Sequence, residues 1–302
     1  MLRGSPGFDT PEHMAEREPM FAIRPLYLIF IDSLHRFGIP YQLAISLISS
    51  ACYFAIGILL LAWTRKPFLS ALTMCFPLMM LLGRQGVPDG LNALCILGAL
   101  YALVHKRDGQ AIAVLMSAVW IRTDSVLVCF ALLLWLVYER RLGAFYCAVL
   151  MAVAAASVAA INYYSGNYGY VVTFRAAFVG ARHPSMISHA ALTAHEYIAA
   201  WVLNLPSIVP QTAPWVLMGA LAWYLKFRNR EWLLPVTAAA IVHFAMFPSG
   251  EVRYLNWACL FAGVIFVAGL PEVRARRSKA VSHRATIKNA LVPLDSRSAV
   301  AG

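Results

Sequence analysis

The chain has 302 residues, of which 61% are hydrophobic and only 13% are charged, and its formal net charge is +11. A soluble domain carries about 45–50% apolar and about 25% charged residues. The composition therefore excludes a soluble enzyme, a disordered chain and a fibrous repeat, and it predicts an all-α protein that crosses a membrane several times.

Residues 1–38 are predicted to form an external N-terminal segment. Residues 1–20 are polar and carry four acids, which is unlike a signal peptide. The stretch Phe21–Gly38 has one apolar face and scattered charges, a pattern typical of a helix that lies in the membrane interface. An external N-terminus without a targeting segment requires either translocation of the tail or an upstream helix that is missing from this sequence.

The region 39–270 is predicted to be a transmembrane helical bundle of about nine spans. Its apolar runs occupy 41–63, 67–82, 91–104, 111–121, 125–138, 143–163, 198–225, 232–247 and 255–270. Several runs are shorter than the roughly 20 residues that cross hydrocarbon as a helix, so we expect flanking residues to extend them. The last residues, 271–302, are predicted to be a disordered basic tail that touches anionic lipid.

The positions of lysine and arginine predict the orientation of the bundle. Alternate gaps (64–66, 105–110, 139–142, 226–231 and 271–302) hold 16 of these residues, whereas the other gaps (83–90, 122–124, 164–197 and 248–254) hold only 5. Positive residues favour the cytoplasmic side, so the C-terminus is predicted to be cytoplasmic. A single span over 111–138 would reverse every later gap, which favours a break at 122–124.

Three short external loops each hold one arginine and one acid close to the membrane. The pairs are Arg84 with Asp89, Arg122 with Asp124, and Glu251 with Arg253, which Tyr254 follows. Ions are costly in hydrocarbon, so these groups either pin the loops together by ion pairs or line a shared pocket. Arginine binds phosphate oxygens in a planar fork, and a carboxylate can act as general base on a hydroxyl. The shared pocket would thus suit a phosphate leaving group and a hydroxyl acceptor.

The longest external loop, 164–197, is rich in tyrosine and contains Arg175, Arg182 and His183. These groups suit sugar stacking and phosphate contacts, although a belt of interfacial tyrosines explains the aromatic residues equally well. The histidines of this loop lie six residues apart, which does not place them on one helix face, so no metal site is predicted. His243 lies within an apolar run and is predicted to be a packed, hydrogen-bonded histidine rather than a catalyst. The basic tail has no aromatic residue to stack on bases, which argues against nucleic-acid binding.

Four short motifs, in this order and on one side of the membrane, resemble the GT-C superfamily of integral-membrane glycosyltransferases. They are RPLY at 24–27, PDGL at 88–91, RTD at 122–124 and GEVRYLNW at 250–257. The resemblance covers about residues 20–270. It implies transfer of a sugar from a polyprenyl-phosphate carrier to a hydroxyl of a glycan or lipid acceptor at the external face.

The resemblance also implies roles for individual residues. Asp9 matches the carboxylate that usually acts as general base in the first external loop, although the helix that precedes that loop is absent here. Arg84, Arg122 and Arg253 would contact the lipid phosphate, while Asp89, Asp124 and Glu251 would order the site or bind the acceptor. Some members of the superfamily use a divalent cation and others do not, and the sequence leaves this open.

Two other functions stay open at the level of the sequence. A lipid-linked polysaccharide polymerase or ligase would depend on Arg175, Arg182 and His183 more than on Asp9. A transporter or scaffold of an envelope-glycan pathway would carry charges in the middle of the membrane, where this sequence has almost no Asp or Glu.

Overall fold

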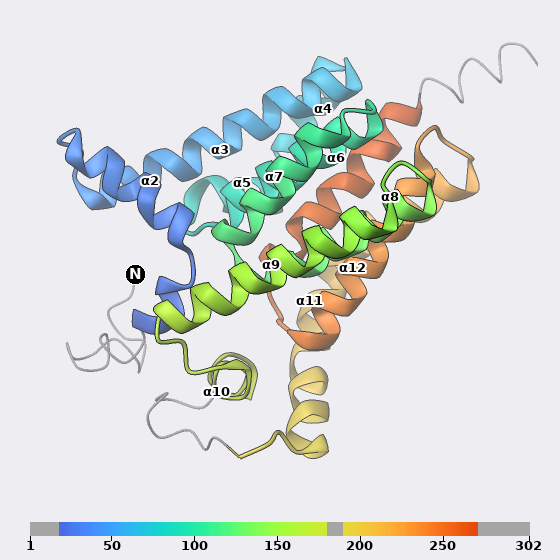
Figure 1. The fold of residues 1–302 in the computed structure, drawn as a ribbon. Helices are drawn as coiled ribbons and strands as arrows, with labels where there is room; N and C mark the ends of the chain where they lie inside the picture. The colour runs from blue at the N-terminus through green and yellow to red at the C-terminus, as the bar shows by residue number, and fades with distance from the viewer. Residues whose placement is uncertain (1–17, 180–189, 271–302) are drawn as a thin grey trace, which may run out of the picture.

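The computed structural model describes residues 18–179 and 190–270, and within these ranges it is helical and contains no strand (Figure 1). Asp9, Arg182, His183 and the basic tail lie outside the described residues. A short helical stretch covers 18–22. The longer elements are α2 (Pro25–Arg36), α3 (Tyr41–Thr64), α4 (Pro67–Met74), α5 (Pro77–Arg84), α6 (Asp89–Val104), α7 (Asp108–Ile121), α8 (Val126–Tyr138), α9 (Ala144–Tyr164), α10 (Tyr170–Phe174), α11 (Ala194–Tyr224), α12 (Leu233–Met246) and a C-terminal helical segment, Val252–Leu270. Each apolar run of the sequence is therefore helical.

Three helices are long and apolar enough to cross a membrane, namely α3, α9 and the C-terminal segment. α4 and α5 pass the same test together but are bent by 66° at their junction, as in a broken span or a re-entrant loop. α6, α7 and α8 are apolar but shorter. The chain is thus an all-helical protein with helices suited to a membrane.

Prolines explain why the run 67–82 forms two helices. Pro67 and Pro77 each occupy the first turn of a helix, where the missing backbone N–H is not needed. Pro77 could not continue α4, because it has no N–H to donate to the preceding turn. α3 ends just before this pair, where Arg65 adopts a left-handed conformation with a φ of 52°.

Ion pairs show that α6, α7 and α8 run up and down the bundle. Arg122, which follows α7, pairs with Asp89 at the start of α6. At the opposite ends of these helices, Arg141 pairs with Asp108 and donates to the Leu103 carbonyl at 2.8 Å. The chain therefore reverses at 122–125, where Arg122 is extended, and no continuous helix covers 111–138.

The core of the bundle lies between α6, α8 and the C-terminal segment. Leu97, Leu132 and Leu260 are completely buried there. By contrast, α3 exposes large apolar residues such as Phe54 and Ile58, which is expected of a helix that faces lipid. The loop between α9 and α11 lies at the same end as the α12 C-terminus, because Tyr170 donates to the Met246 carbonyl at 2.7 Å. The predicted external loops thus meet at one end of the bundle.

Candidate functional site

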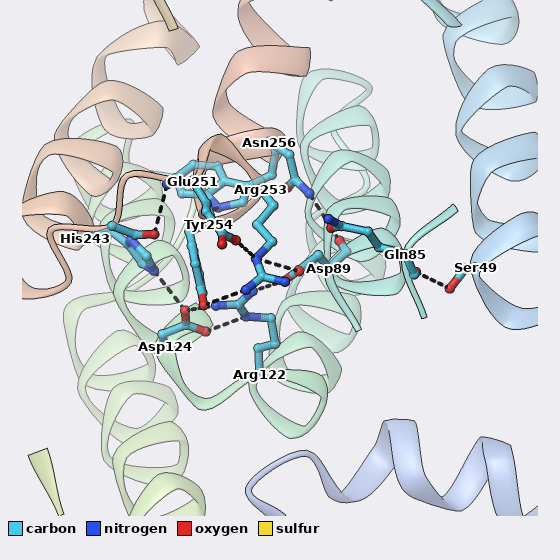
Figure 2. A network of polar contacts seen from close by, with 12 residues as sticks. Ser49, Gln85, Asp89, Arg122, Asp124, His243, Glu251, Arg253, Tyr254 and Asn256 are labelled. Atoms are coloured by element: carbon cyan, nitrogen blue, oxygen red, sulfur yellow. Dashed lines mark hydrogen bonds and ion pairs between the residues drawn. The ribbon is translucent and has the colours of Figure 1, made fainter. Parts of the chain in front are cut away.

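Three connections that are distant in the sequence converge on a cluster of charged side chains (Figure 2). Asp89 opens α6, directly after Pro88, and a carboxylate is favoured at this position by the helix dipole. Arg122 and Asp124 lie between α7 and α8, and Arg253 lies in the 3₁₀ turn that begins the C-terminal segment. This set of loops is the one from which the sequence predicted a shared pocket.

Arg122 is the centre of the cluster. Its Nη1 group pairs with Asp89, while Nε donates to Asp124 Oδ1 at 3.0 Å and Nη2 to Asp124 Oδ2 at 2.5 Å. Its guanidinium carbon also lies 4.8 Å from the centre of the Tyr254 ring. Arg122 and Asp89 are only 8% and 4% exposed. Because two carboxylates occupy this guanidinium, Arg122 holds the loops together rather than offering free donors to a phosphate.

Arg253 also contacts the Tyr254 ring, with its guanidinium carbon 5.0 Å from the ring centre. It forms an ion pair with Glu251, and its Nε lies 3.9 Å from Asp89 Oδ2. The Glu251 side chain is 59% exposed, whereas Arg253 is 24% exposed and its Nε atom is buried, so water hydrates mainly the carboxylate of this pair. Arg253 is therefore better placed than Arg122 to exchange its carboxylate for an incoming anion.

His243 joins the cluster from α12, which the sequence did not predict. Its Nε2 atom lies 2.8 Å from Asp124 Oδ2. Burial would raise the pKa of Asp124, but the charge of Arg122 and the hydrogen bond with His243 outweigh burial and hold this pKa well below its ordinary range. Asp124 is therefore ionised and is a weak proton acceptor.

Arg24 is a second residue that sequence reasoning left outside the site. α2 packs against α7, and this packing brings Arg24 into the electrostatic field of Arg122, Asp124 and Tyr254. Burial, followed by the charge of Arg122, lowers the pKa of Arg24 from 12.5 to about 10. Arg24 contacts the Phe21 ring at 5.4 Å but forms no ion pair with any described residue. The RPLY motif at 24–27 was the feature of the sequence that could have indicated a place for Arg24 in the site.

Two predicted site residues do not join the cluster. Arg84 ends α5 and is exposed, without an ion pair to the described part of the chain. Arg175 lies on a π-helical turn, where its Nε donates to Glu196 at 2.8 Å and its Nη1 to the Ala190 carbonyl at 2.8 Å. This arginine braces the loop between α10 and α11.

An apolar groove of about 710 Å³ runs between α11, α12 and the C-terminal segment. Its wall includes Phe244 and Leu255, which are the chain neighbours of His243 and Tyr254. Other wall residues, such as Val216 and Ile241, are more than half exposed, so the groove opens on the apolar surface of the bundle. One end of the groove is thus formed by chain neighbours of two cluster residues, although no residue of the cluster itself lines the groove.

Among the described residues, no three His, Cys, Asp or Glu side chains are arranged to hold a metal ion. Comparison of the chain with protein-family models, curated proteins and solved structures gives no match. The function is therefore inferred from the geometry of the site.

Proposed function

We propose that this chain is an integral-membrane glycosyltransferase of the GT-C type, which moves a sugar from a polyprenyl-phosphate carrier to an acceptor hydroxyl. The observation that carries this proposal is that Phe244 and Leu255, chain neighbours of residues in the Arg122 cluster, line an apolar groove that opens on the bundle surface. A substrate with a charged phosphate and a long hydrocarbon chain needs both environments side by side. The sugar would sit where they meet.

The proposal includes a topology of about nine crossings, with the charged cluster at the external face of a bacterial inner membrane. The gaps at the opposite end of the helices carry most of the lysines and arginines, which supports a cytoplasmic C-terminus. α2 would lie in the external interface. Its exposed apolar residues Ile29 and Phe30, together with the surface ion pair of Asp32 with Arg36, suit that position.

In the proposed reaction, the acceptor oxygen attacks the anomeric carbon and the bond from this carbon to the phosphate oxygen breaks. Negative charge then grows on the departing phosphate, and fixed cations stabilise it. Arg253, after releasing Glu251, and Arg24, which has no carboxylate partner among the described residues, are the cations that would do this. Asp89 and Asp124 are committed to Arg122, so their role is to position that arginine rather than to take a proton.

The alternative functions have less support. A polymerase or ligase centred on the 164–197 loop would need Arg175, whose guanidinium is already occupied by Glu196 and backbone carbonyls. A transporter would need charges along the helices. The buried ion pairs of the described residues instead lie at helix ends, as Arg122 and Arg141 illustrate.

The test is sugar transfer in membranes that contain the protein. Radiolabelled polyprenyl-phosphate glucose, mannose and arabinose would be supplied, and label in the acceptor fraction would be measured. We expect transfer by the wild type with one of these donors and a loss of at least tenfold in Arg253→Ala. Arg228→Ala, an exposed arginine at the opposite end, is the matched control. Absence of transfer by well-expressed wild-type protein with all three donors would refute the proposal.

A further inference from the structure

One buried titratable group near the site has no role in the reaction described so far. His243 lies in the last turn of α12, and its side chain is 3% exposed. Its Nε2 atom meets Asp124, whereas its Nδ1 atom is buried and has no hydrogen-bond partner among the described residues. A buried polar atom without a partner is uncommon in a native protein and calls for an explanation.

The contact with Asp124 determines the tautomer of the ring. An ionised carboxylate only accepts hydrogen bonds, so Nε2 must carry the proton that it shares with Asp124. In the neutral ring, Nδ1 is then a bare lone pair. The group that would complete this site is a hydrogen-bond donor from outside the chain, such as a hydroxyl.

We propose that His243 is the general base of the sugar transfer, and that its Nδ1 atom accepts the proton of the acceptor hydroxyl. This inference rests on the proposed function. As the acceptor oxygen bonds to the anomeric carbon, its proton moves to Nδ1. The electron pair of the broken bond goes to the phosphate oxygen of the carrier, and the imidazolium later returns its proton to that phosphate or to water.

The surroundings of His243 suit this role better than those of the carboxylates. Asp124, held ionised by Arg122, faces the opposite ring nitrogen and stabilises the imidazolium as it forms. The Phe247 ring lies 5.3 Å from the imidazole, and Phe244 leads into the apolar groove. His243 is thus the chain neighbour of a groove residue and contacts the charged cluster through Asp124, which acts as its positioning residue.

The decisive variant is His243→Gln. Its amide N–H can still donate to Asp124, but the side chain has no counterpart of the Nδ1 lone pair. Loss of a general base costs about 10²–10⁴-fold in rate, so we expect transfer to hydroxyl acceptors to fall by that factor with an unchanged KM for the donor. Sodium azide is the diagnostic probe, because azide attacks carbon without losing a proton. We expect His243→Gln to form glycosyl azide at a rate within about threefold of the wild type.

A merely structural histidine would give a different pattern. Hydroxyl transfer and glycosyl azide formation would then fall together, and equal hydroxyl transfer by variant and wild type would also overturn the proposal. If the His243→Gln variant does not fold, His243→Asn is the second variant to test. If neither variant folds, the role of His243 is structural. His105→Gln, at an exposed histidine that contacts the Tyr101 carbonyl, is the control. A wild type that transfers no sugar would refute the proposed function, whereas an active wild type with an active variant would refute only the role of His243.

Discussion

The two ends of the bundle carry arginines that look alike in the sequence but differ in their surroundings. Arg122 and Arg141 are both largely buried, and each is held by two carboxylates. The Arg141 guanidinium has further partners as well, because it donates to the Leu103 carbonyl and contacts the Trp232 ring. Arg122 instead has Arg24 within electrostatic range, and His243 on the far side of Asp124 has an Nδ1 atom without a hydrogen-bond partner among the described residues. An arginine held by two acids therefore joins helix ends at both ends of the bundle, and in the proposed function the groups that surround Arg122 would carry the chemistry.

Of the variants that test this difference between the two ends, Arg122→Ala is expected to have the largest effect on stability and on sugar transfer. The variant leaves Asp89, which is 4% exposed, with only the more distant Arg253, 3.9 Å away, as an ionic partner. Removal of one member of a buried ion pair costs about 3–5 kcal/mol, so we expect a marked fall in the Tm of the detergent-solubilised protein and loss of sugar transfer. Thermal unfolding followed by size-exclusion chromatography measures the first effect. A Tm equal to that of the wild type would show that Asp89 is already hydrated.

Arg141→Ala is the matched variant at the other end and should have a smaller effect. Asp108 and Glu139 keep side-chain exposures of 30% and 21%, so water can replace part of the lost contact. We expect a loss of about 1–2 kcal/mol, below the usual value for a charged hydrogen bond because of this hydration. Sugar transfer per folded molecule should stay at the wild-type level. A tenfold loss of transfer in the folded fraction would contradict the assignment of Arg141 as purely structural.

Arg24→Ala should separate activity from stability at the end of the bundle that holds the Arg122 cluster. Arg24 has no carboxylate partner among the described residues, and it is repelled by Arg122. Its removal should therefore leave the Tm unchanged within about 2 °C while the KM for the polyprenyl-phosphate donor rises about tenfold, a loss of roughly 1.4 kcal/mol of binding. Steady-state transfer at varied donor concentration measures this. An unchanged KM, or a fall in Tm without a change in KM, would remove Arg24 from the site.

Helix positions and the convergence of the loops could be predicted from the sequence, because apolar runs and charge placement report directly on them. The break at 122–124 followed from the orientation of later gaps, and the ion pairs of Arg122 and Arg141 lie at opposite ends as that break requires. The 66° bend between α4 and α5 was not predicted, although Pro77 was a readable cause.

The partners of individual site residues were less predictable. His243 and Asp124 are 119 positions apart, and an apolar run around a histidine indicates burial without indicating what faces the ring. Arg24 enters the site only because α2 packs on α7, a tertiary contact that helical periodicity does not encode. Arg84 was expected beside Arg122 because both belong to short loops, but it ends α5 on an exposed face. Sequence patterns thus located the loops, while packing decided which side chains meet.

The smallest expected effect concerns the brace between Arg175 and Glu196. The hydrogen bonds from Arg175, and then those from Thr193, lower the pKa of Glu196 from 4.5 to about 2. A carboxylate with a lowered pKa stabilises the folded loop fully above its unfolded pKa, and this contribution is lost as the pH falls from about 4.5 toward 2. We expect backbone amide exchange around 193–197 to accelerate relative to the bundle core as the pH falls through this window, after correction for intrinsic rates. Glu196→Gln should show the faster exchange at neutral pH and no further change in the window, whereas a variant that still responds to pH would assign the effect to another group.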